Sequence, residues 1–467
     1  MDLLPAEVIT FIAEYLHDDR RAIARWALCG RAYFHRLLPH IYHNLEVTDR
    51  YPLRRRPGLN RDAASPNTKI SWQGLVRFLP LLLNRPDIAQ MIRSLRVPSM
   101  RTITYTTDMW RSWFVGEKHL LQGLGSALTA RIRDITDSYA DVAQAEQTWF
   151  SSLLNGPRFD DAWLALLLTR LHHLECIDIE IDADFRMDFH VYEGRDMSWT
   201  WLVLSSMPSG RTKMKSPTHL LKKMVLGQAA FFWQPHLEVL SFPSLTSLEL
   251  RGCRFGIDLD ELAYLLSMRA PLHTLVLVFD AAWNSNEIRY PINVSSDLLD
   301  ISALFQSLQP LHDKLKTLTI ALGPGARAAM QGGTLKSLTT FHALERLHIS
   351  HEIIIQVGLH SLPRMLKELR ILRLKNLSRM DLAFLLSEQS RFLPFVEHFA
   401  IEADGIEGGR DGLQPPDRIL HPGTHLVVWM RLPRAVKPPS PVVWEVTSGA
   451  PTTSDHDDRF HCVFASS

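Results

Sequence analysis

Apolar residues recur at helical spacing near the start of the chain. Val8, Ile12 and Leu16 lie four residues apart. This spacing predicts a helix over residues 4–16 with one apolar face. Pro5 fits the first turn of such a helix, because its missing N–H would have no partner there.

Two further helices are expected directly after the first. Asp18 and Asp19 can cap a helix that runs to about Cys29, and a third helix is expected over residues 32–38, before Pro39. Such a small bundle buries little surface on its own. The sequence therefore indicates that the bundle packs against a partner or a neighbouring domain.

A second pattern, with a longer period, follows from about residue 90. Its clearest unit, Leu245-x-x-Leu248-x-Leu250-x-x-Cys253, matches the leucine-rich repeat template in full. From Leu245 onward, units begin 27, 43, 29, 25 and 27 residues apart. Most of these steps lie near the usual period of about 20–29 residues. The units that match the first six positions, or weaker copies of them, begin at Ile92, Leu174, Leu272, Leu315, Leu344, Leu369 and Val396.

These units predict short parallel strands with helices between them. Residues four and six of a unit point to one side of a strand, so that stacked units share a continuous core. Residues 259–268 and 380–387 have helical patterns between such strands. We therefore expect an α/β fold, with a small helical domain followed by an irregular leucine-rich-repeat solenoid. The alternative is an ordinary doubly wound α/β domain with leucine-rich strands.

Composition shifts along the chain indicate four segments. The helical module is expected over residues 1–48, and a linker with a connecting helix over residues 49–90. The solenoid is expected over residues 91–404. Glycine and proline then mark a C-terminal extension over residues 405–467, which we expect to be partly disordered.

Composition and motifs narrow the function classes. Fifty-one Lys and Arg against fifty Asp and Glu give a net charge of +1, so we expect no nucleic acid or membrane partner. The four cysteines form no CxxC pair, and the chain has no P-loop, HExxH or GxSxG motif. We therefore expect a non-catalytic protein of the cytoplasm or nucleus, without cofactor or metal. An enzyme of unknown type is the alternative.

The N-terminal segment resembles the F-box of fungal-type F-box proteins. The domain order is similar to that of F-box proteins with leucine-rich repeats. The residues that carry the resemblance are Leu4-Pro5-x-Glu7-Val8 with Ile12 and Leu16, Leu28-Cys29-x-Arg31, and Pro39-x-Ile41-Tyr42-x-x-Leu45-x-Val47.

This resemblance implies a substrate receptor of an SCF-type cullin ubiquitin ligase. The F-box would bind the adaptor subunit, and through it the cullin, while the repeat domain would hold a protein substrate. Burial in the bundle's own core is the alternative for Val8 and Ile12. A leucine-rich-repeat scaffold that does not engage a ligase is the alternative function. The candidate adaptor contacts are Leu4, Pro5, Val8, Ile12 and Leu28.

The outward positions of the strands are expected to line a concave face that binds the substrate. In the later units these positions form a basic stripe, which would suit an acidic or phosphorylated partner. A solvated sheet face is the alternative for each residue. The candidate substrate-binding residues are Glu249, Arg251, Thr319, Arg346, His348 and Arg373.

Overall fold

The structure is a computed structural model of the chain. It describes residues 4–16, 19–48, 68–100, 153, 159–181, 203, 220–227, 243–253, 259–267, 271–279, 298–323, 326–329, 337–374, 379–403, 425–430, 442–447 and 461–464. Most of the expected C-terminal extension and the first part of the expected linker lie outside these residues. No helix among the described residues is long and apolar enough to cross a membrane.

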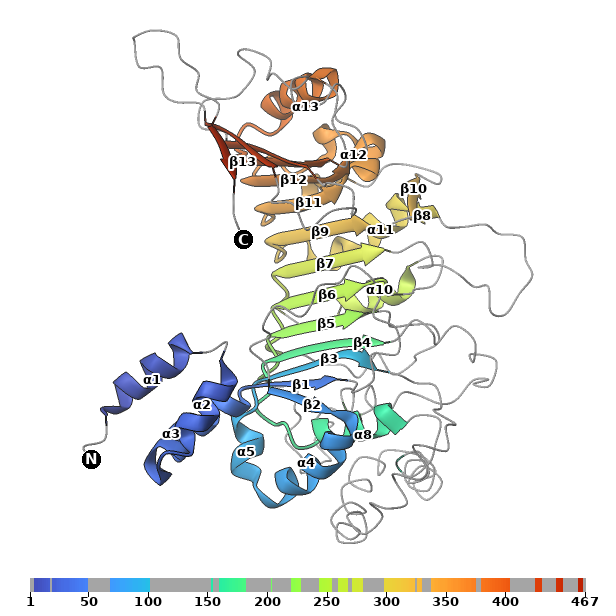
Figure 1. The fold of residues 1–467 in the computed structure, drawn as a ribbon. Helices are drawn as coiled ribbons and strands as arrows, with labels where there is room; N and C mark the ends of the chain where they lie inside the picture. Colours follow the sequence, from blue (N-terminus) through green and yellow to red (C-terminus); the bar gives the residue numbers. More distant parts are fainter. Residues whose placement is uncertain are drawn as a thin grey trace, which may run out of the picture.

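Three helices occupy the N-terminal segment, at the positions where the apolar spacing predicts them (Figure 1). They are α1 (Ala6–Tyr15), α2 (Arg20–Ala27) and α3 (Arg31–Tyr42). The Asp19 side chain caps α2 by accepting the amide of Ala22 at 2.9 Å. Helix α3 continues through Pro39, where we expected a break. The bundle has a core of its own, made of Ile9, Ala13, Ile23, Ala27 and Leu37.

A sheet of fourteen strands forms the body of the described structure. Neighbouring strands run parallel from β2 through β14, whereas β14, β15 and β16 pair antiparallel. In sheet order the strands are β2 (Thr68–Ser71), β1 (Asn44–Thr48), β3 (Ser94–Met100), β4 (Cys176–Ile181), β5 (Lys223–Gly227), β6 (Ser247–Arg251), β7 (Thr274–Phe279), β9 (Thr317–Leu322), β11 (Arg346–Ser350), β12 (Glu368–Leu374), β13 (His398–Ala403), β14 (His425–Met430), β15 (Val442–Thr447) and β16 (His461–Phe464).

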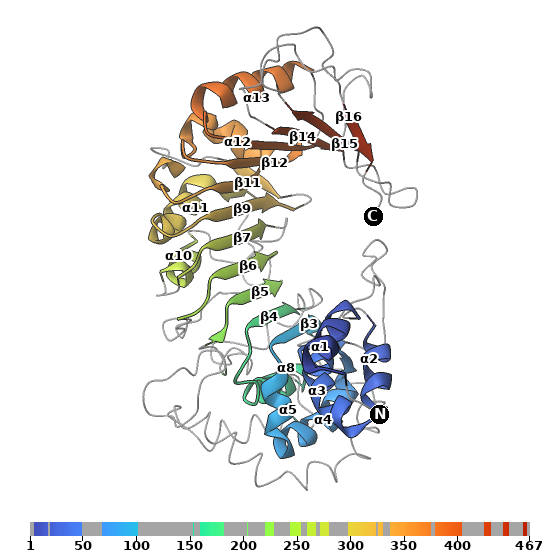
Figure 2. The ribbon, with the colours of Figure 1, turned by 90° about the vertical axis from the view of Figure 1, so that its left-hand side faces the viewer.

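Helices cover one face of this sheet. Helices α10 to α13 lie behind the strands in Figure 1 and to their left in Figure 2. The opposite face, which looks toward the viewer in Figure 1, is called the open face below. The remaining elements are α4 (Trp72–Asn84), α5 (Pro86–Met91), α8 (Phe159–Leu168), α10 (Asp260–Leu266), β8 (Leu298–Asp300), α11 (Ile301–Leu308), η5 (Gln309–Leu311), β10 (Arg327–Ala329), η6 (Leu338–Thr340), α12 (His351–Val357), η7 (Leu359–Ser361) and α13 (Arg379–Phe392).

The repeat leucines meet in register across the strands. Leu275 lies beside Leu248 on one neighbouring strand and beside Leu318 on the other. Leu318 in turn lies beside Leu347. These side chains are buried in one continuous core that also contains Phe305 of α11. The expectation of an α/β fold with parallel strands and intervening helices is therefore confirmed.

The register of β12 differs from the expected one. We expected Leu372 and Leu374 to fill the core, with Arg373 pointing outward. Instead Leu369 and Ile371 lie beside Leu347 and Ile349 of β11. The unit therefore begins at Leu366, three residues earlier than expected.

An irregularity in β12 explains why the later residues still pack. The pairing of β12 with β13 shifts between Ile371 and Leu374. Arg373 has a positive φ of 58° in this segment. Leu374 is consequently buried at the end of the strand, whereas Leu372 is only half-buried. Five apolar residues within nine positions make the two registers look alike in the sequence.

Two leucine-to-alanine variants distinguish the registers of β12. Leu366→Ala should lower the free energy of unfolding by about 2–5 kcal/mol, because it opens a cavity at a fully buried position. Leu372→Ala should lower it by about 1 kcal/mol, since this side chain stays half-exposed. Urea unfolding of both variants beside wild type measures the difference. Equal losses, or a larger loss for Leu372→Ala, would contradict the observed register.

Candidate functional site

Helix α1 is apolar on two sides. Ile9 and Ala13 are about 1% exposed in the core of the bundle. On the outer side, Leu4 is 40%, Val8 39%, Phe11 69% and Tyr15 81% exposed. Val8, Phe11 and Tyr15 fall along one side of the helix at this spacing, and Leu4 lies just before its first turn. We call Leu4, Val8, Phe11 and Tyr15 the α1 stripe.

The expected adaptor contacts fall mostly on this outer side. Leu4, Pro5 and Val8 are exposed, and Leu28, at the end of α2, is 80% exposed. Ile12 is half-buried. The alternative interpretation placed Val8 in the bundle's core, but its side chain is exposed.

Phe11 and Tyr15 were not among the expected contacts. The sequence already shows their helical spacing, because the steps from Leu4 to Val8, Phe11 and Tyr15 are four, three and four residues. Two apolar sides on one helix leave open which side faces inward, and only the packing of α2 and α3 decides it. The start of the stripe is held by Arg36, whose Nη1 donates to the carbonyl of Leu4 at 3.4 Å.

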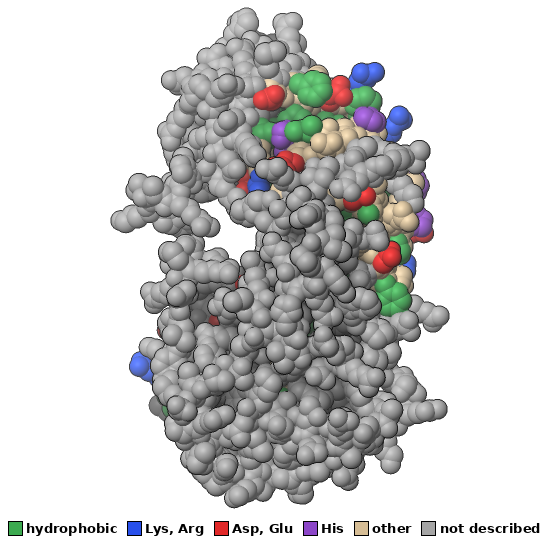
Figure 3. Space-filling model, turned by 90° about the vertical axis from the view of Figure 1, so that its right-hand side faces the viewer, with side chains coloured by type: hydrophobic (Ala, Val, Ile, Leu, Met, Phe, Trp, Pro, Cys, Tyr) green, Lys and Arg blue, Asp and Glu red, His purple; other side chains and the backbone are tan. Residues whose placement is uncertain are grey.

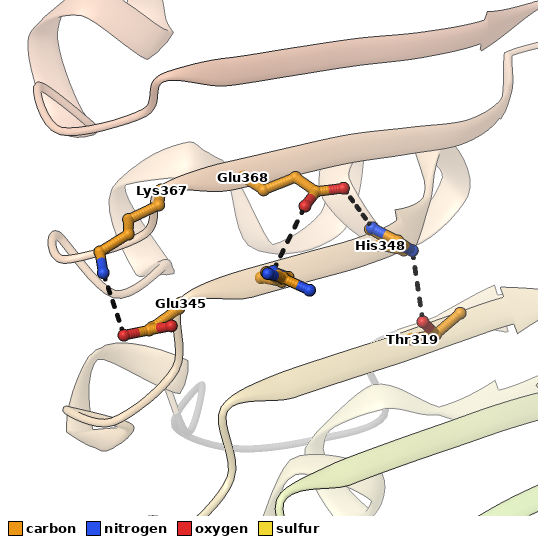
Figure 4. A network of polar contacts seen from close by, with 6 residues as sticks. Thr319, Glu345, His348, Lys367 and Glu368 are labelled. Carbon is orange, nitrogen blue, oxygen red and sulfur yellow. Dashed lines mark hydrogen bonds and ion pairs between the residues drawn. The ribbon is translucent and has the colours of Figure 1, made fainter. Parts of the chain in front are cut away.

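On the open face, Glu368 joins the basic side chains of β11 (Figure 4). His348 Nε2 lies 2.9 Å from Glu368 Oε1, and Arg346 Nε lies 3.6 Å from Glu368 Oε2. The other ring nitrogen of His348 lies 3.5 Å from Thr319 Oγ1 on β9. One carboxylate therefore serves both basic side chains.

The basic stripe expected on the later strands is largely neutralised by such pairs. Beyond Glu368, Arg370 Nη2 lies 3.7 Å from Glu402 Oε2 on the neighbouring strand. Arg373 does not join the stripe, because its guanidinium donates to the backbone carbonyl of Leu322 at the end of β9. An acidic partner would have to compete with these internal carboxylates.

The earlier strands pair their charges in the same way. Arg96 lies between Glu46 and Asp178, at 3.8 Å and 3.4 Å from their carboxylate oxygens. On β6, Arg251 Nε lies 2.6 Å from Glu249 Oε1. Glu249 and Arg251 thus lie on the open face, as expected, but they bind each other.

The order Thr319, His348, Glu368 repeats the hydroxyl, imidazole and carboxylate order of hydrolytic triads. The contact of 3.5 Å between hydroxyl and imidazole is at the outer limit of a hydrogen bond. The strand amides beside Thr319 and His348 are engaged in the sheet, so they are not free to stabilise an oxyanion. We interpret the network as one that orients His348. Among the described residues, no group of three His, Cys, Asp or Glu could hold a metal ion.

Two pairs of oppositely charged residues directly precede neighbouring strands. Lys367 Nζ lies 3.1 Å from Glu345 Oε1 (Figure 4), and Lys222 Nζ lies 2.7 Å from Glu175 Oε2. The hydrogen bond from Lys367 lowers the pKa of Glu345. The hydrogen bond from Lys222 likewise lowers the pKa of Glu175. These pairs join neighbouring turns of the chain at one edge of the sheet.

Comparison with models of protein families gave no match, and neither did comparison with curated proteins.

The pairing of Glu345 with Lys367 predicts a pH-dependent stability. Because the folded-state pKa of Glu345 is lowered, the pair stabilises the fold above the unfolded pKa of Glu345. This contribution is lost as the pH falls through the folded pKa. Lys367→Gln should therefore be less stable than wild type at neutral pH, and the difference should vanish in acid.

Urea unfolding at neutral pH and at about pH 3 measures this difference. Lys314→Gln is the matched control, because it removes the same charge from an exposed lysine that lies before β9, two strands earlier in the sheet. NMR titration of the Glu345 carboxyl group should show its pKa rising in Lys367→Gln. A stability difference that persists unchanged in acid would rule out the pair as its cause.

Proposed function

We propose that the chain is a substrate-recognition subunit of an SCF-type ubiquitin ligase. In this proposal the N-terminal bundle binds the adaptor subunit and the sheet domain, as an irregular leucine-rich-repeat solenoid, binds a protein substrate. The α1 stripe is the observation that carries it. Monomeric proteins rarely expose a contiguous row of large apolar side chains without a partner that covers it.

The energetics of the α1 stripe support docking. Burial of a large apolar side chain contributes about 1.5–3 kcal/mol when it is complete, and the stripe offers four partly exposed ones. Leu28, which follows α2, is also 80% exposed on the bundle. The gain has to exceed the loss of translational and rotational freedom on binding. Two aromatic side chains, Phe11 and Tyr15, suit such an interface because they bury much area with few rotatable bonds.

The proposed role of the chain is positional. A receptor that holds a substrate near a ubiquitin-charged enzyme raises the effective concentration of the target lysine and needs no bond chemistry of its own. The charged side chains on the open face form ion pairs with one another, and a surface of this kind can still bind a protein.

A scaffold that does not engage a ligase is the second candidate. The α1 stripe supports this candidate equally well, because the stripe could be covered by a protein other than the adaptor. The two candidates differ only in what covers α1, so a direct binding measurement separates them.

Binding of purified adaptor subunit to the immobilised full chain tests the proposal. Leu4→Ala/Pro5→Ala and Phe11→Ala/Tyr15→Ala should each weaken binding about tenfold or more, because they remove apolar area from the α1 stripe and from the exposed Pro5 beside it. Titration by biolayer interferometry gives the dissociation constants. Circular dichroism should show an unchanged fold, since the altered side chains are exposed.

Phe384→Ala/Phe395→Ala is the matched control for the aromatic pair. Phe384 and Phe395 are also largely exposed, at 64% and 56%, but Phe384 lies in α13 and Phe395 between α13 and β13, far from α1 in the sequence. On the side of the molecule in Figure 3, hydrophobic side chains are interspersed with acidic, basic and histidine side chains. This control should bind adaptor as wild type does. Absence of adaptor binding by wild type would refute the ligase proposal and leave the scaffold.

A further inference from the structure

The side chains that β7 and β9 themselves present on the open face are uncharged. The outward side chains there are short, and all are half-buried. The alternating residues on these strands, such as Leu275 and Ile320, are buried in the core. We call the six outward residues the neutral tract: Thr274, Val276 and Val278 on β7, and Thr317, Thr319 and Ala321 on β9.

Longer, charged side chains border the neutral tract on both sides. On β6, Glu249 and Arg251 form an ion pair, and on β11, Arg346 and His348 share the carboxylate of Glu368. These groups already have partners. An ionic ligand would have to replace those contacts and desolvate charges, which costs about as much as it gains. A partner gains more by covering the uncharged side chains between them.

The neighbouring parts of the open face are less suited to apolar contact. On β5, Val225 is only 2% exposed although it lies outside the core cluster. Gly227 on the same strand is overlaid by Glu180, since an added Cβ would lie 2.9 Å from Glu180 Cγ. On β12 and β13 the face carries the pair of Arg370 and Glu402.

The width of the neutral tract matches one helix. In sheet order, β7 and β9 lie between β6 and β11. Neighbouring strands are about 4.8 Å apart, so the backbones of the two bordering strands are about 14 Å apart. An α-helix with its side chains is about 10–12 Å wide. A single helix along the strand direction would cover the tract and place its polar flanks beside the charged borders.

We propose that the neutral tract binds one helix of a partner protein, through a helix face of small and apolar residues without charge. The inference rests on the proposed function in taking the partner to be a protein, and it names the chemistry that the open face recognises. It replaces the acidic or phosphorylated partner that the basic residues of the sequence suggested.

A phage-displayed library of helix-forming peptides, randomised along one helix face, provides the probe. Panning against the full chain should enrich peptides whose randomised positions hold Ala, Val, Leu, Ile, Ser or Thr. Val276→Glu and Val276→Arg should each weaken binding of an enriched peptide about tenfold or more, because either charge would have to be covered by the uncharged helix face. The use of both signs separates an apolar contact from an ionic one.

Ile355→Glu and Ile355→Arg are the matched controls. Ile355 is a β-branched residue on α12 in the helix layer, and its side chain is 63% exposed. Both control variants should bind the peptide as wild type does. Thermal unfolding should show all four variants folded, because Val276 and Ile355 both have contact with solvent.

Three results would overturn the inference. They are enrichment of Asp- or Glu-rich peptides, stronger binding by Val276→Arg, and no enrichment of any peptide that depends on Val276. Adaptor binding by the same variants should stay at the wild-type level. If the chain binds the peptide but not the adaptor, the ligase proposal alone is refuted. If it binds the adaptor but shows no Val276-dependent peptide binding, the proposal for the neutral tract alone is refuted.

Discussion

Parallel pairing in register is the constraint on which the arrangement of side chains depends. At the start of β9, the carbonyl of His273 accepts the amides of both Lys316 and Thr317, each at 2.9 Å. The same pair of hydrogen bonds recurs at β11, where the carbonyl of Lys316 accepts the amides of Glu345 and Arg346. These contacts determine where each strand begins. A slip of one residue would move the leucines to the open face and the polar residues into the core.

The strength of the apolar signal decided how much of this fold could be predicted. Units at Leu245, Leu272, Leu315 and Leu344 have leucines only where the core needs them, and their strands follow the template. Strand β5 was not recognised, because Met224 takes the place of a leucine after Leu221. Strand β12 was misplaced by three residues, since its excess of leucines satisfied two registers. Local composition cannot choose between registers that the neighbouring strands select through main-chain hydrogen bonds.

The candidate site was predictable in its residue types but not in its electrostatics. Arg346 and His348 were expected on the outward side of β11, and the structure places them there. Their partner Glu368 lies one turn of the chain later, and the pairing depends on the register of β12, which was predicted wrongly. A stripe that looked basic in the sequence is therefore close to neutral. The side of α1 that faces outward was equally undetermined, because both sides are apolar.

The connection between bundle and sheet bears on both proposals. Helix α3 ends at Tyr42 and β1 begins at Asn44, so only His43 separates them. The carbonyl of His43 accepts the amides of Arg93 and Ser94 at 2.9 and 3.0 Å, as the residue before a strand does elsewhere in the sheet. The ring of Tyr42 stacks on that of Phe78 in α4 at 5.9 Å between centroids. These contacts continue the sheet directly from the last helix of the bundle.

A receptor gains effective concentration only if the connection between its two binding surfaces restricts their separation. A long flexible linker would let the two surfaces move far apart, whereas a direct helix-to-strand connection keeps the bundle next to the sheet. Strand β1 is paired on both sides, with β2 and β3, so the connection is anchored within the sheet and not at a free end. This short, anchored connection favours a role in which the chain positions one protein relative to another over one in which the two surfaces act independently.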